Sequence, residues 1–179
     1  VQVELDRLAA VLEDMPRLVA VYEERLQDIF DATLSRAIHL KVATLLEEVL
    51  GDDDRAEGHY RAALDFEGDE QEPLRALDRI LLRQEKWSDL LEVLDRELAA
   101  VADPLEQAEI YARLGEIRLD INGDQDGAFE SFRGALEREP SMERALAAME
   151  RLLQEEAFKV GPRGFGADLR IGYRPRQAG

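Results

Sequence analysis

Several residue types and patterns on which catalysis or metal binding depends are missing from this chain. It has no cysteine, which excludes disulfide bonds, thiolate metal sites and a cysteine nucleophile. Only two histidines are present, His39 and His59, and neither belongs to an HExxH motif or has a third ligand at metal spacing. Pairs of carboxylates carry no signal, since 40 acidic residues produce such pairs by chance. We therefore expect no enzyme, no cofactor and no metal.

Basic residues are also few. The chain has 23 Lys and Arg against 40 Asp and Glu, which gives a net charge of −17. We expect no nucleic-acid partner, because binding to phosphates requires a basic face. A basic protein or peptide partner is compatible with this charge, although acidity alone mostly provides solubility.

Long apolar runs are absent as well. No run approaches the roughly 18–20 residues of a membrane span, so we expect no membrane partner. The first residues, VQVELDRLAAVLEDMPRL, have neither the basic start nor the continuous apolar core of a signal peptide. These features favour a cytoplasmic location, and the start at Val1 in place of Met indicates a fragment or a processed product.

What the chain does contain is an internal repeat built from strong helix formers. The stretches GDDDRAEGHYRAAL (51–64) and GDQDGAFESFRGAL (123–136) lie 72 residues apart. A shift of 72 aligns 84 pairs without a gap, of which 21 are identical. Most identical pairs are apolar or small and recur at helical spacing, as in Leu5/Leu77, Leu18/Leu90, Val21/Val93, Leu26/Leu98, Ile38/Ile110, Gly51/Gly123, Ala56/Ala128, Ala63/Ala135, Leu74/Leu146 and Ala76/Ala148.

Turn and capping residues divide each 72-residue unit into four helices. Asp103 followed by Pro104 predicts a helix start, Gly123 a left-handed helix end, and Asp124 the cap of the next helix. The predicted helices are 3–13, 15–30, 33–50, 53–66, 71–85, 87–101, 104–121, 125–138 and 141–156. Such short loops force successive helices into antiparallel hairpins. One hairpin cannot bury its own apolar stripe, so the hairpins must stack as a solenoid.

Seven residues of the later unit form a recognisable set: Tyr111, Leu114 and Gly115 in the first helix, and Ala128, Phe132, Ala135 and Pro140 in the second. In identity and spacing this set resembles the tetratricopeptide repeat (TPR) family. The turn between the helices is one residue longer than usual. The resemblance implies an all-α fold, an α-solenoid of TPR-like hairpins with roughly nine helices over residues 1–156, in the manner of a divergent bacterial array.

The earlier unit departs further from the pattern. It retains Ala56, Tyr60 and Ala63, but Ala43 replaces the glycine and Gly68 the proline.

In TPR arrays the first helix of each hairpin lines a concave groove, so the resemblance implies which side chains face a partner. The implied positions are Thr44, Glu47 and Glu48, then Arg75, Arg79 and Arg83, then Glu109, Ala112, Glu116 and Asp120, with Ala37 and Leu40 beside them. An acidic band then lies beside a basic one, able to recognise the charge pattern of an extended peptide. The alternative is that these are ordinary solvated helix faces with pairing between neighbouring residues.

The stretch DINGDQDG at 120–127 has oxygen-bearing side chains at alternating positions, like a calcium loop. An EF-hand would require glycine where Gln125 stands and glutamate where Ser131 stands. Capping and chain reversal between two helices explain the same residues, so we prefer that interpretation.

The composition changes at position 157, where we expect the repeat domain to end. Residues 157–179 are basic and contain frequent Gly and Pro. Three interpretations are open: a flexible linker or terminus, a basic segment that folds back on the acidic repeats, or a non-native extension.

The sequence therefore predicts a protein–protein interaction scaffold that holds a peptide or protein partner in the groove. The alternative is a structural or self-assembly module, or a spacer within a longer repeat protein. Stacking of like arrays would involve exposed apolar residues near the ends, such as Leu8, Val11, Leu12, Leu152 and Leu153.

Overall fold

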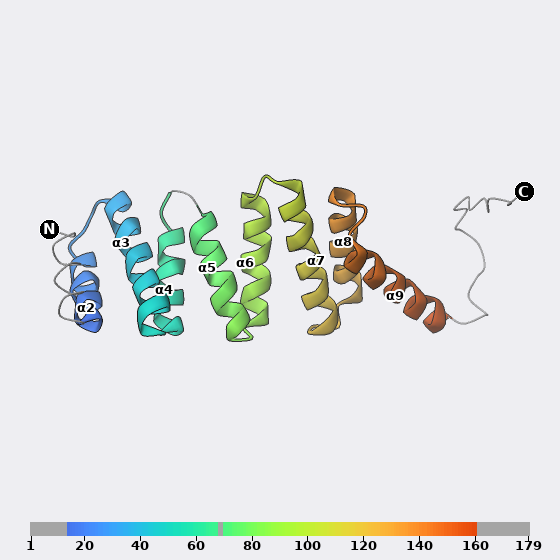
Figure 1. Cartoon of the computed structure of the whole chain (residues 1–179), viewed down its shortest axis with the longest axis horizontal. Coiled ribbons are helices and arrows are strands. Elements are labelled where there is room, and N and C mark those ends of the chain that lie inside the picture. The colour runs from blue at the N-terminus through green and yellow to red at the C-terminus, as the bar shows by residue number, and fades with distance from the viewer. Residues whose placement is uncertain (1–13, 68–69, 161–179) are drawn as a thin grey trace, which may run out of the picture.

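The computed structural model describes residues 14–67 and 70–160, with side chains up to Gln154. Its elements in order are α2 (Met15–Leu26), α3 (Ala32–Thr44), the π-helix η1 (Leu45–Leu50), α4 (Asp53–Leu64), α5 (Gln71–Arg83), α6 (Trp87–Ala100), α7 (Pro104–Asp120), α8 (Gln125–Arg138) and α9 (Glu143–Val160). The helices stand side by side along one axis, with α2 at one end and α9 at the other (Figure 1). The expected all-helical solenoid is confirmed.

Aspartates begin most of these helices, as the repeat suggested. Asp14, Asp31, Asp52, Asp103 and Asp124 each accept a hydrogen bond from the backbone N–H three residues later, at 2.8–3.3 Å. The predicted caps at positions 103 and 124 are thus confirmed.

Left-handed glycines end the two long helices that precede the repeated turns. Gly51 has φ of +66° and Gly123 has φ of +65°. The turn at 120–127 is therefore built by chain reversal and capping, in line with the interpretation preferred above.

The predicted helix 3–13 lies outside the described residues. Among the described helices, the bounds or geometry differ most from the prediction in three places. Helix α2 ends at Leu26 rather than at residue 30, because the chain must turn before Asp31 caps α3. The predicted helix 33–50 changes from α to π geometry after Thr44. Helix α9 continues to Val160, past the boundary expected at 156, so the first residues assigned to the tail belong to a helix.

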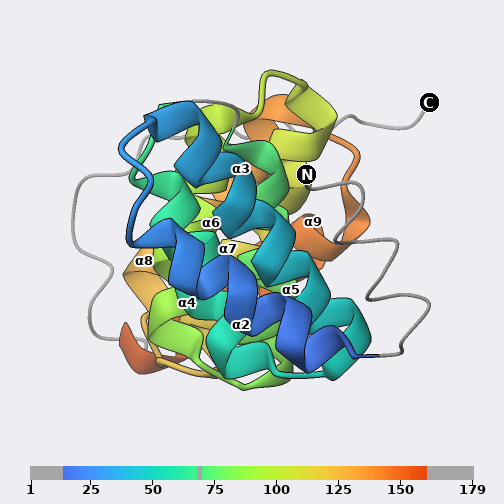
Figure 2. The same cartoon turned by 90° about the vertical axis from the view of Figure 1, so that its left-hand side faces the viewer.

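Contacts between helices follow the order of the chain, as a stacked array requires. The substantial helix–helix contacts join elements that are neighbours in sequence. Seen from its end, the array is a column in which each hairpin lies behind the previous one (Figure 2). Ala56 and Ala128, equivalent in the repeat, are both fully buried between paired helices. The apolar interior is shared by successive hairpins rather than enclosed by any single one.

Candidate binding face

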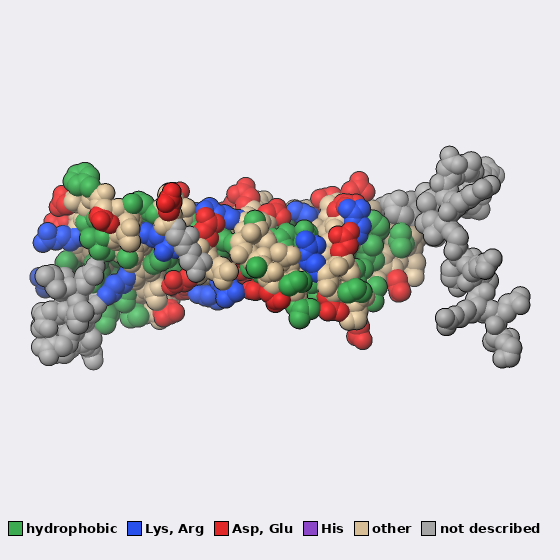
Figure 3. Space-filling view, turned by 90° about the horizontal axis from the view of Figure 1, so that it is seen from above, with side chains coloured by type: hydrophobic (Ala, Val, Ile, Leu, Met, Phe, Trp, Pro, Cys, Tyr) green, Lys and Arg blue, Asp and Glu red, His purple; other side chains and the backbone are tan. Residues whose placement is uncertain are grey.

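Charged side chains gather on the first helices of the hairpins, α3 with η1, α5, α7 and α9. We call the set the charged face: Glu47, Glu48, Arg75, Arg79, Arg83, Glu106, Glu109, Glu116, Asp120, Arg144 and Arg151. Along the array its bands alternate from acidic on η1 to basic on α5, acidic on α7 and basic on α9. A view from above shows acidic and basic side chains interspersed along the array (Figure 3).

Glu47 anchors the first part of this face between η1 and α5. Its carboxylate accepts hydrogen bonds from Arg79 at 3.2 Å, Arg83 at 3.3 Å and the Tyr60 hydroxyl at 3.0 Å. Burial, together with the nearby carboxylate, raises the pKa of Tyr60 to about 12, although the Thr44 hydroxyl, 3.5 Å from the Tyr60 oxygen, opposes the rise. The side chain of Glu47 is only 7% exposed, so three donors compensate its lost hydration.

A hollow of about 630 Å³ opens beside this anchor. It is lined by Glu47, Glu48, Gly51, Asp53, Arg79 and Arg83. Arg83 also donates to Asp53 at 2.8 Å, and this hydrogen bond is the main reason that the pKa of Arg83 is raised. Charged side chains dominate the lining of the hollow and offer both signs of charge.

Between α5 and α7 the charged face is closed by ion pairs. Arg75 contacts Glu106 at 2.6 Å, and beneath them Arg113 binds Asp78 through two parallel hydrogen bonds of 2.6 and 2.7 Å. Glu97 on α6 lies buried next to this group, with its Oε2 atom lacking a hydrogen-bond partner. Burial raises the pKa of Glu97, and the nearby Asp78 adds to the rise.

The second hollow lies between α7, α8 and α9 and has a volume of about 460 Å³. Apolar side chains form much of its lining: Leu119, Phe132, Ala147 and Ala148. Charged pairs stand at its rim, where Arg151 contacts Asp120 at 3.1 Å and Arg144 contacts both Glu109 and Glu116. It therefore combines an apolar surface with an ionic border.

The structure brings most of the residues expected in the groove onto this one face. The predicted charged residues form ion pairs between one first helix and the next, from η1 to α5, α5 to α7 and α7 to α9. The exception is Glu48, which is exposed at the first hollow. Thr44 is half-buried and its hydroxyl donates to the carbonyl of Leu40 at 3.0 Å, so it serves its own helix.

Ala112 departs from its expected position. It is fully buried and packs with the core beside α8, so it presents no surface to a partner. The equivalent residue in the earlier copy of the repeat is Leu40 on α3, which is half-buried. The helical phase assigned from the resemblance was therefore about one position off at this point of α7.

Sequence reasoning missed the partners that α9 contributes and the apolar lining of the second hollow. Arg151 was detectable, because it is identical to Arg79 one repeat earlier. Arg144 was not, since its counterpart is Glu72. Phe132 was identified by its TPR-like spacing, but only the packing of α7, α8 and α9 makes its buried ring part of the lining of a hollow.

A histidine pair between α3 and α4 was also missed. The Nδ1 atoms of His39 on α3 and His59 on α4 lie 3.0 Å apart, and His59 Nε2 lies 3.2 Å from a Glu23 carboxylate oxygen on α2. Because that carboxylate accepts, a neutral His59 carries its proton on Nε2 and the His39 Nδ1–H donates to its Nδ1. Burial lowers the pKa of His39, and the charge of His59 lowers it further. Burial acts to raise the pKa of Glu23, but hydrogen bonds from Arg55 and His59 outweigh it, so that this pKa is lowered.

No cluster of three or more His, Cys, Asp or Glu that could hold a metal ion occurs within the described ranges 14–67 and 70–160. In the same ranges no helix is both long and apolar enough to cross a membrane.

Comparison with solved structures bears on the fold. The chain is similar to the crystal structure of MamA protein, with a TM-score of 0.54 at 15% sequence identity, over 87% of this chain and 80% of that one. The fold is TPR-like. A second MamA crystal structure matches with a TM-score of 0.49 at 15% identity, over 85% and 94% of the two chains. BtubC (BKLC) from P. vanneervenii matches with 0.47 at 16% identity, over 97% and 84%.

Sequence comparison adds no closer relationship. No family model matches the chain, and no curated protein matches it in sequence.

Proposed function

We propose that the chain is a divergent, bacterial-type member of the TPR family and works as a protein–protein interaction scaffold. In this proposal a peptide or protein segment lies along the charged face. The observation that supports it is that the ion pairs of this face run between successive first helices, in rows across the array. Ordinary solvated helices pair along one helix instead, as Arg133 does with Glu130 and Glu137 on α8.

The low energies of the exposed ion pairs allow this face to exchange an internal pair for a pair with a partner. The arginines of the charged face are between about 38% and 55% exposed. The pairs with both partners exposed, such as Arg144–Glu109 and Arg151–Asp120, contribute only about 0–1 kcal/mol each, so a partner can replace one at little cost. The alternating bands then select a partner by the order of its charges.

The second hollow suggests the chemistry of the partner. Its apolar lining fits one apolar side chain, and Glu116 and Asp120 at the rim favour basic residues beside it. We infer an extended segment with a basic–apolar pattern over α7 and α9, with acidic residues toward Arg79 and Arg83 on α5. A basic partner is compatible with the net charge of −17.

Charge reversal on α7 tests the proposal. Glu109, Glu116 and Asp120 are changed together to Lys, and the protein is used to capture partners from its source organism. A matched variant reverses Glu92, Glu130 and Glu137, which are exposed acidic residues of α6 and α8 away from the charged face. We expect the first variant to lose the captured partner and the second to retain it. Equal capture by wild type and the first variant would show that the partner does not use this face.

The second candidate function is a structural or self-assembly module. A specific feature favours it as well: α9 exposes Leu146 and Leu153, by 41% and 56%. Leu152, expected to be exposed, is in fact buried, at 3% exposure. Light scattering of the purified chain separates the candidates, since self-assembly makes the mass rise with concentration.

A further inference from the structure

The two histidines of the chain, His39 on α3 and His59 on α4, are brought together by the fold. Their Nδ1 atoms lie 3.0 Å apart, and their ring centroids are separated by 5.1 Å with the ring planes tilted by 45°. Imidazole nitrogen is a preferred ligand of late transition metals such as Cu²⁺, Ni²⁺ and Zn²⁺. Two imidazoles that meet between neighbouring helices are therefore a candidate metal site, although the spacing of the histidines in sequence gave no sign of one.

The distance between the two nitrogens suits one coordination geometry better than another. With metal–nitrogen bonds of about 2.0–2.1 Å, two nitrogens lie about 2.8–3.0 Å apart in neighbouring positions of a square complex and about 3.3–3.4 Å apart in a tetrahedral one. The observed separation of 3.0 Å matches the square arrangement. Square or tetragonal sites with nitrogen and oxygen ligands are typical of Cu²⁺ and Ni²⁺, whereas Zn²⁺ prefers a tetrahedron.

The hydrogen bonds of the pair leave one nitrogen ready to bind a metal. His59 donates its Nε2–H to Glu23 at 3.2 Å, so its Nδ1 carries the lone pair. In the metal-free chain this lone pair accepts the Nδ1–H of His39. Metal binding requires His39 to release that proton from Nδ1 and to take up another on Nε2. Both imidazoles stay neutral, and the chain gains or loses no proton overall.

Glu23 and Arg55 hold His59 in this orientation. Histidines that bind metals commonly donate their other ring N–H to a carboxylate, which fixes the ring and makes the ligand nitrogen more basic. Glu23 is in this position, and Arg55 donates to the same Glu23 oxygen at 2.7 Å. Glu23 is not a third ligand, because it contacts the ring nitrogen that faces away from His39. It is a positioning residue for His59.

The later copy of the repeat shows what has changed at this position. Tyr111 and Ser131, the counterparts of the two histidines, line a hollow of about 250 Å³. A cation there would meet Arg118, which donates to Ser131 at 2.7 Å, whereas the counterpart of Arg118 in the earlier copy is the uncharged Leu46. Burial lowers the pKa of His39, but the carboxylate of Asp65 opposes this, so the surroundings of the pair attract positive charge. The earlier copy thus has both the ligands and the field that a cation requires.

We propose that His39 and His59 form a binding site for a divalent late transition-metal ion, with Cu²⁺ and Ni²⁺ preferred over Zn²⁺. The two Nδ1 atoms bind the metal, and water completes its coordination. The ion links α3 to α4, and through Glu23 it also fixes α2. With two protein ligands the site remains open, so binding is weaker than at a closed site with four ligands and is reversible. None of these residues belongs to the charged face, so the site goes beyond the proposed function and does not depend on it.

Isothermal titration calorimetry of the full, untagged chain with CuCl₂ at pH 7.5 tests the site. The sequence has no other imidazole and no thiolate to compete for the ion. We expect the wild type to bind one equivalent of Cu²⁺, and to bind Ni²⁺ and Zn²⁺ more weakly. Glu23→Gln keeps both ligands but removes the carboxylate behind His59, so it should weaken Cu²⁺ binding by about tenfold. His39→Gln and His59→Gln each remove a ligand and should each weaken it further.

The matched control combines Glu130→Gln with Glu137→Gln. These residues line the hollow of the later copy, beside the counterparts of the two histidines. The control should bind Cu²⁺ as the wild type does. Ca²⁺, which takes oxygen ligands, should not displace Cu²⁺ from the wild type. Circular dichroism verifies that each variant folds.

Electron paramagnetic resonance of the wild-type Cu²⁺ complex gives a second measurement that needs no substitution. Electron spin-echo modulation should show coupling to two imidazole groups. A spectrum with one imidazole, or with none, would contradict the paired site.

Two calorimetric results would also overturn it. One is the absence of saturable Cu²⁺ binding by the wild type. The other is binding that both histidine variants retain, or that only one of them loses, because surface carboxylates or a single imidazole would then hold the ion. Neither result bears on the charged face, which is tested by the reversal of Glu109, Glu116 and Asp120.

Discussion

The α3–α4 and α7–α8 hairpins occupy the same positions of the repeat, but different side chains fill their interfaces. In α7–α8, a Cβ atom added to Gly115 would lie 2.7 Å from the Phe132 ring, and one added to Gly134 would lie 2.8 Å from the Tyr111 ring. Neither distance is possible for a real Cβ, so glycine permits this contact. The contact between α7 and α8 is accordingly more extensive than the contact of α4 with α3 and η1.

In α3–α4 the two glycines are replaced by Ala43 and Ala62, and the aromatic rings become Tyr60 and His39. The Tyr60 hydroxyl reaches Glu47, which holds Arg79 and Arg83. The α7–α8 hairpin therefore places the apolar ring of Phe132 at the second hollow. The Tyr60 hydroxyl of the α3–α4 hairpin instead supports Glu47, the acidic anchor of the first hollow. Substitutions at these positions, together with Glu47 in place of Leu119, thus change the chemistry of the face that the repeat presents.

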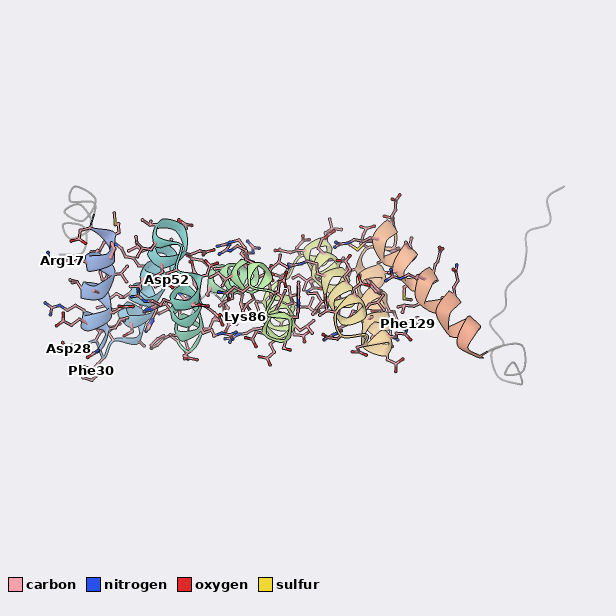
Figure 4. All side chains as sticks on the ribbon, turned by 90° about the horizontal axis from the view of Figure 1, so that it is seen from below. Arg17, Asp28, Phe30, Asp52, Lys86 and Phe129 are labelled. Carbon is pink, nitrogen blue, oxygen red and sulfur yellow. The ribbon has the colours of Figure 1, made fainter. Side chains whose placement is uncertain are left out.

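The largest expected effect breaks the tight hairpin. Phe132→Ala removes a fully buried ring and leaves a cavity, and we expect a loss of about 3–5 kcal/mol in the free energy of unfolding. Urea denaturation followed by circular dichroism measures it. Phe30, which is 98% exposed and lies at the α2 end of the array (Figure 4), is the control, and Phe30→Ala should change stability by less than about 0.5 kcal/mol. A comparable loss for both variants would contradict the core role of Phe132.

Gly115→Ala tests whether close approach distinguishes the two hairpins. The added methyl must displace Phe132 or separate the helices, at a cost of about 1–3 kcal/mol. Gly58→Ala on α4 is the matched control, because nothing lies within 4 Å of its added Cβ, and it should stabilise the protein by about 0.5–1 kcal/mol. If Gly115→Ala stabilises the protein as well, the interface is looser than described.

Tyr60→Phe gives the first hairpin the ring found in the second. It deletes the hydroxyl that donates to Glu47 and should cost about 0.5–1.5 kcal/mol at neutral pH. In the wild type the folded chain keeps the phenol proton up to a pKa of about 12, whereas an unfolded tyrosine releases it near 10. The contribution of this group is therefore fully present below pH 10 and is lost as the pH rises toward 12. Denaturation of both proteins at pH 9 to 12 should show a steeper decline in the wild type; parallel curves would rule out this assignment.

The smallest effect concerns the histidine pair that only α3–α4 contains. The pKa of His39 lies below its ordinary value of 6.5 in the folded chain, so the unfolded chain binds the proton first. Stability is fully present above pH 6.5 and declines as the pH falls, by no more than about 1.4 kcal/mol per pH unit. His39→Gln cannot titrate and should flatten the difference in unfolding free energy between pH 7.5 and 5.5. An unchanged slope would place the titration elsewhere.

Much of the fold was predictable from sequence, because the signals that start and end its helices act over short distances along the chain. Aspartate caps and left-handed glycines act within a few residues, so Asp103, Asp124 and Gly123 are recognisable without any tertiary information. The repeated stripe likewise predicted the burial of Ala56 and Ala128. Binding by the residues assigned to the groove remains a prediction, although most of them do share one face.

Other features depend on packing that no local pattern records. The burial of Ala112 follows from the exact phase of α7 against α8. The change to π geometry in η1 is equally invisible in the spacing of apolar residues. This π-helix contains Glu47, which has no acidic counterpart in the repeat. His39 on α3 and His59 on α4 meet through their Nδ1 atoms. The 20 residues between them in the sequence do not indicate that the two rings come into contact.

The amino-acid sequence by itself determined that this protein is a row of stacked helical hairpins, because a stripe that no hairpin can bury alone requires a neighbour in the same register. Only the tertiary structure decided which stripe of α9 is covered by α8 and which charges meet across the first helices. Those outcomes depend on the distances and angles between helices, which side-chain volumes such as those of Gly115 and Ala43 set collectively.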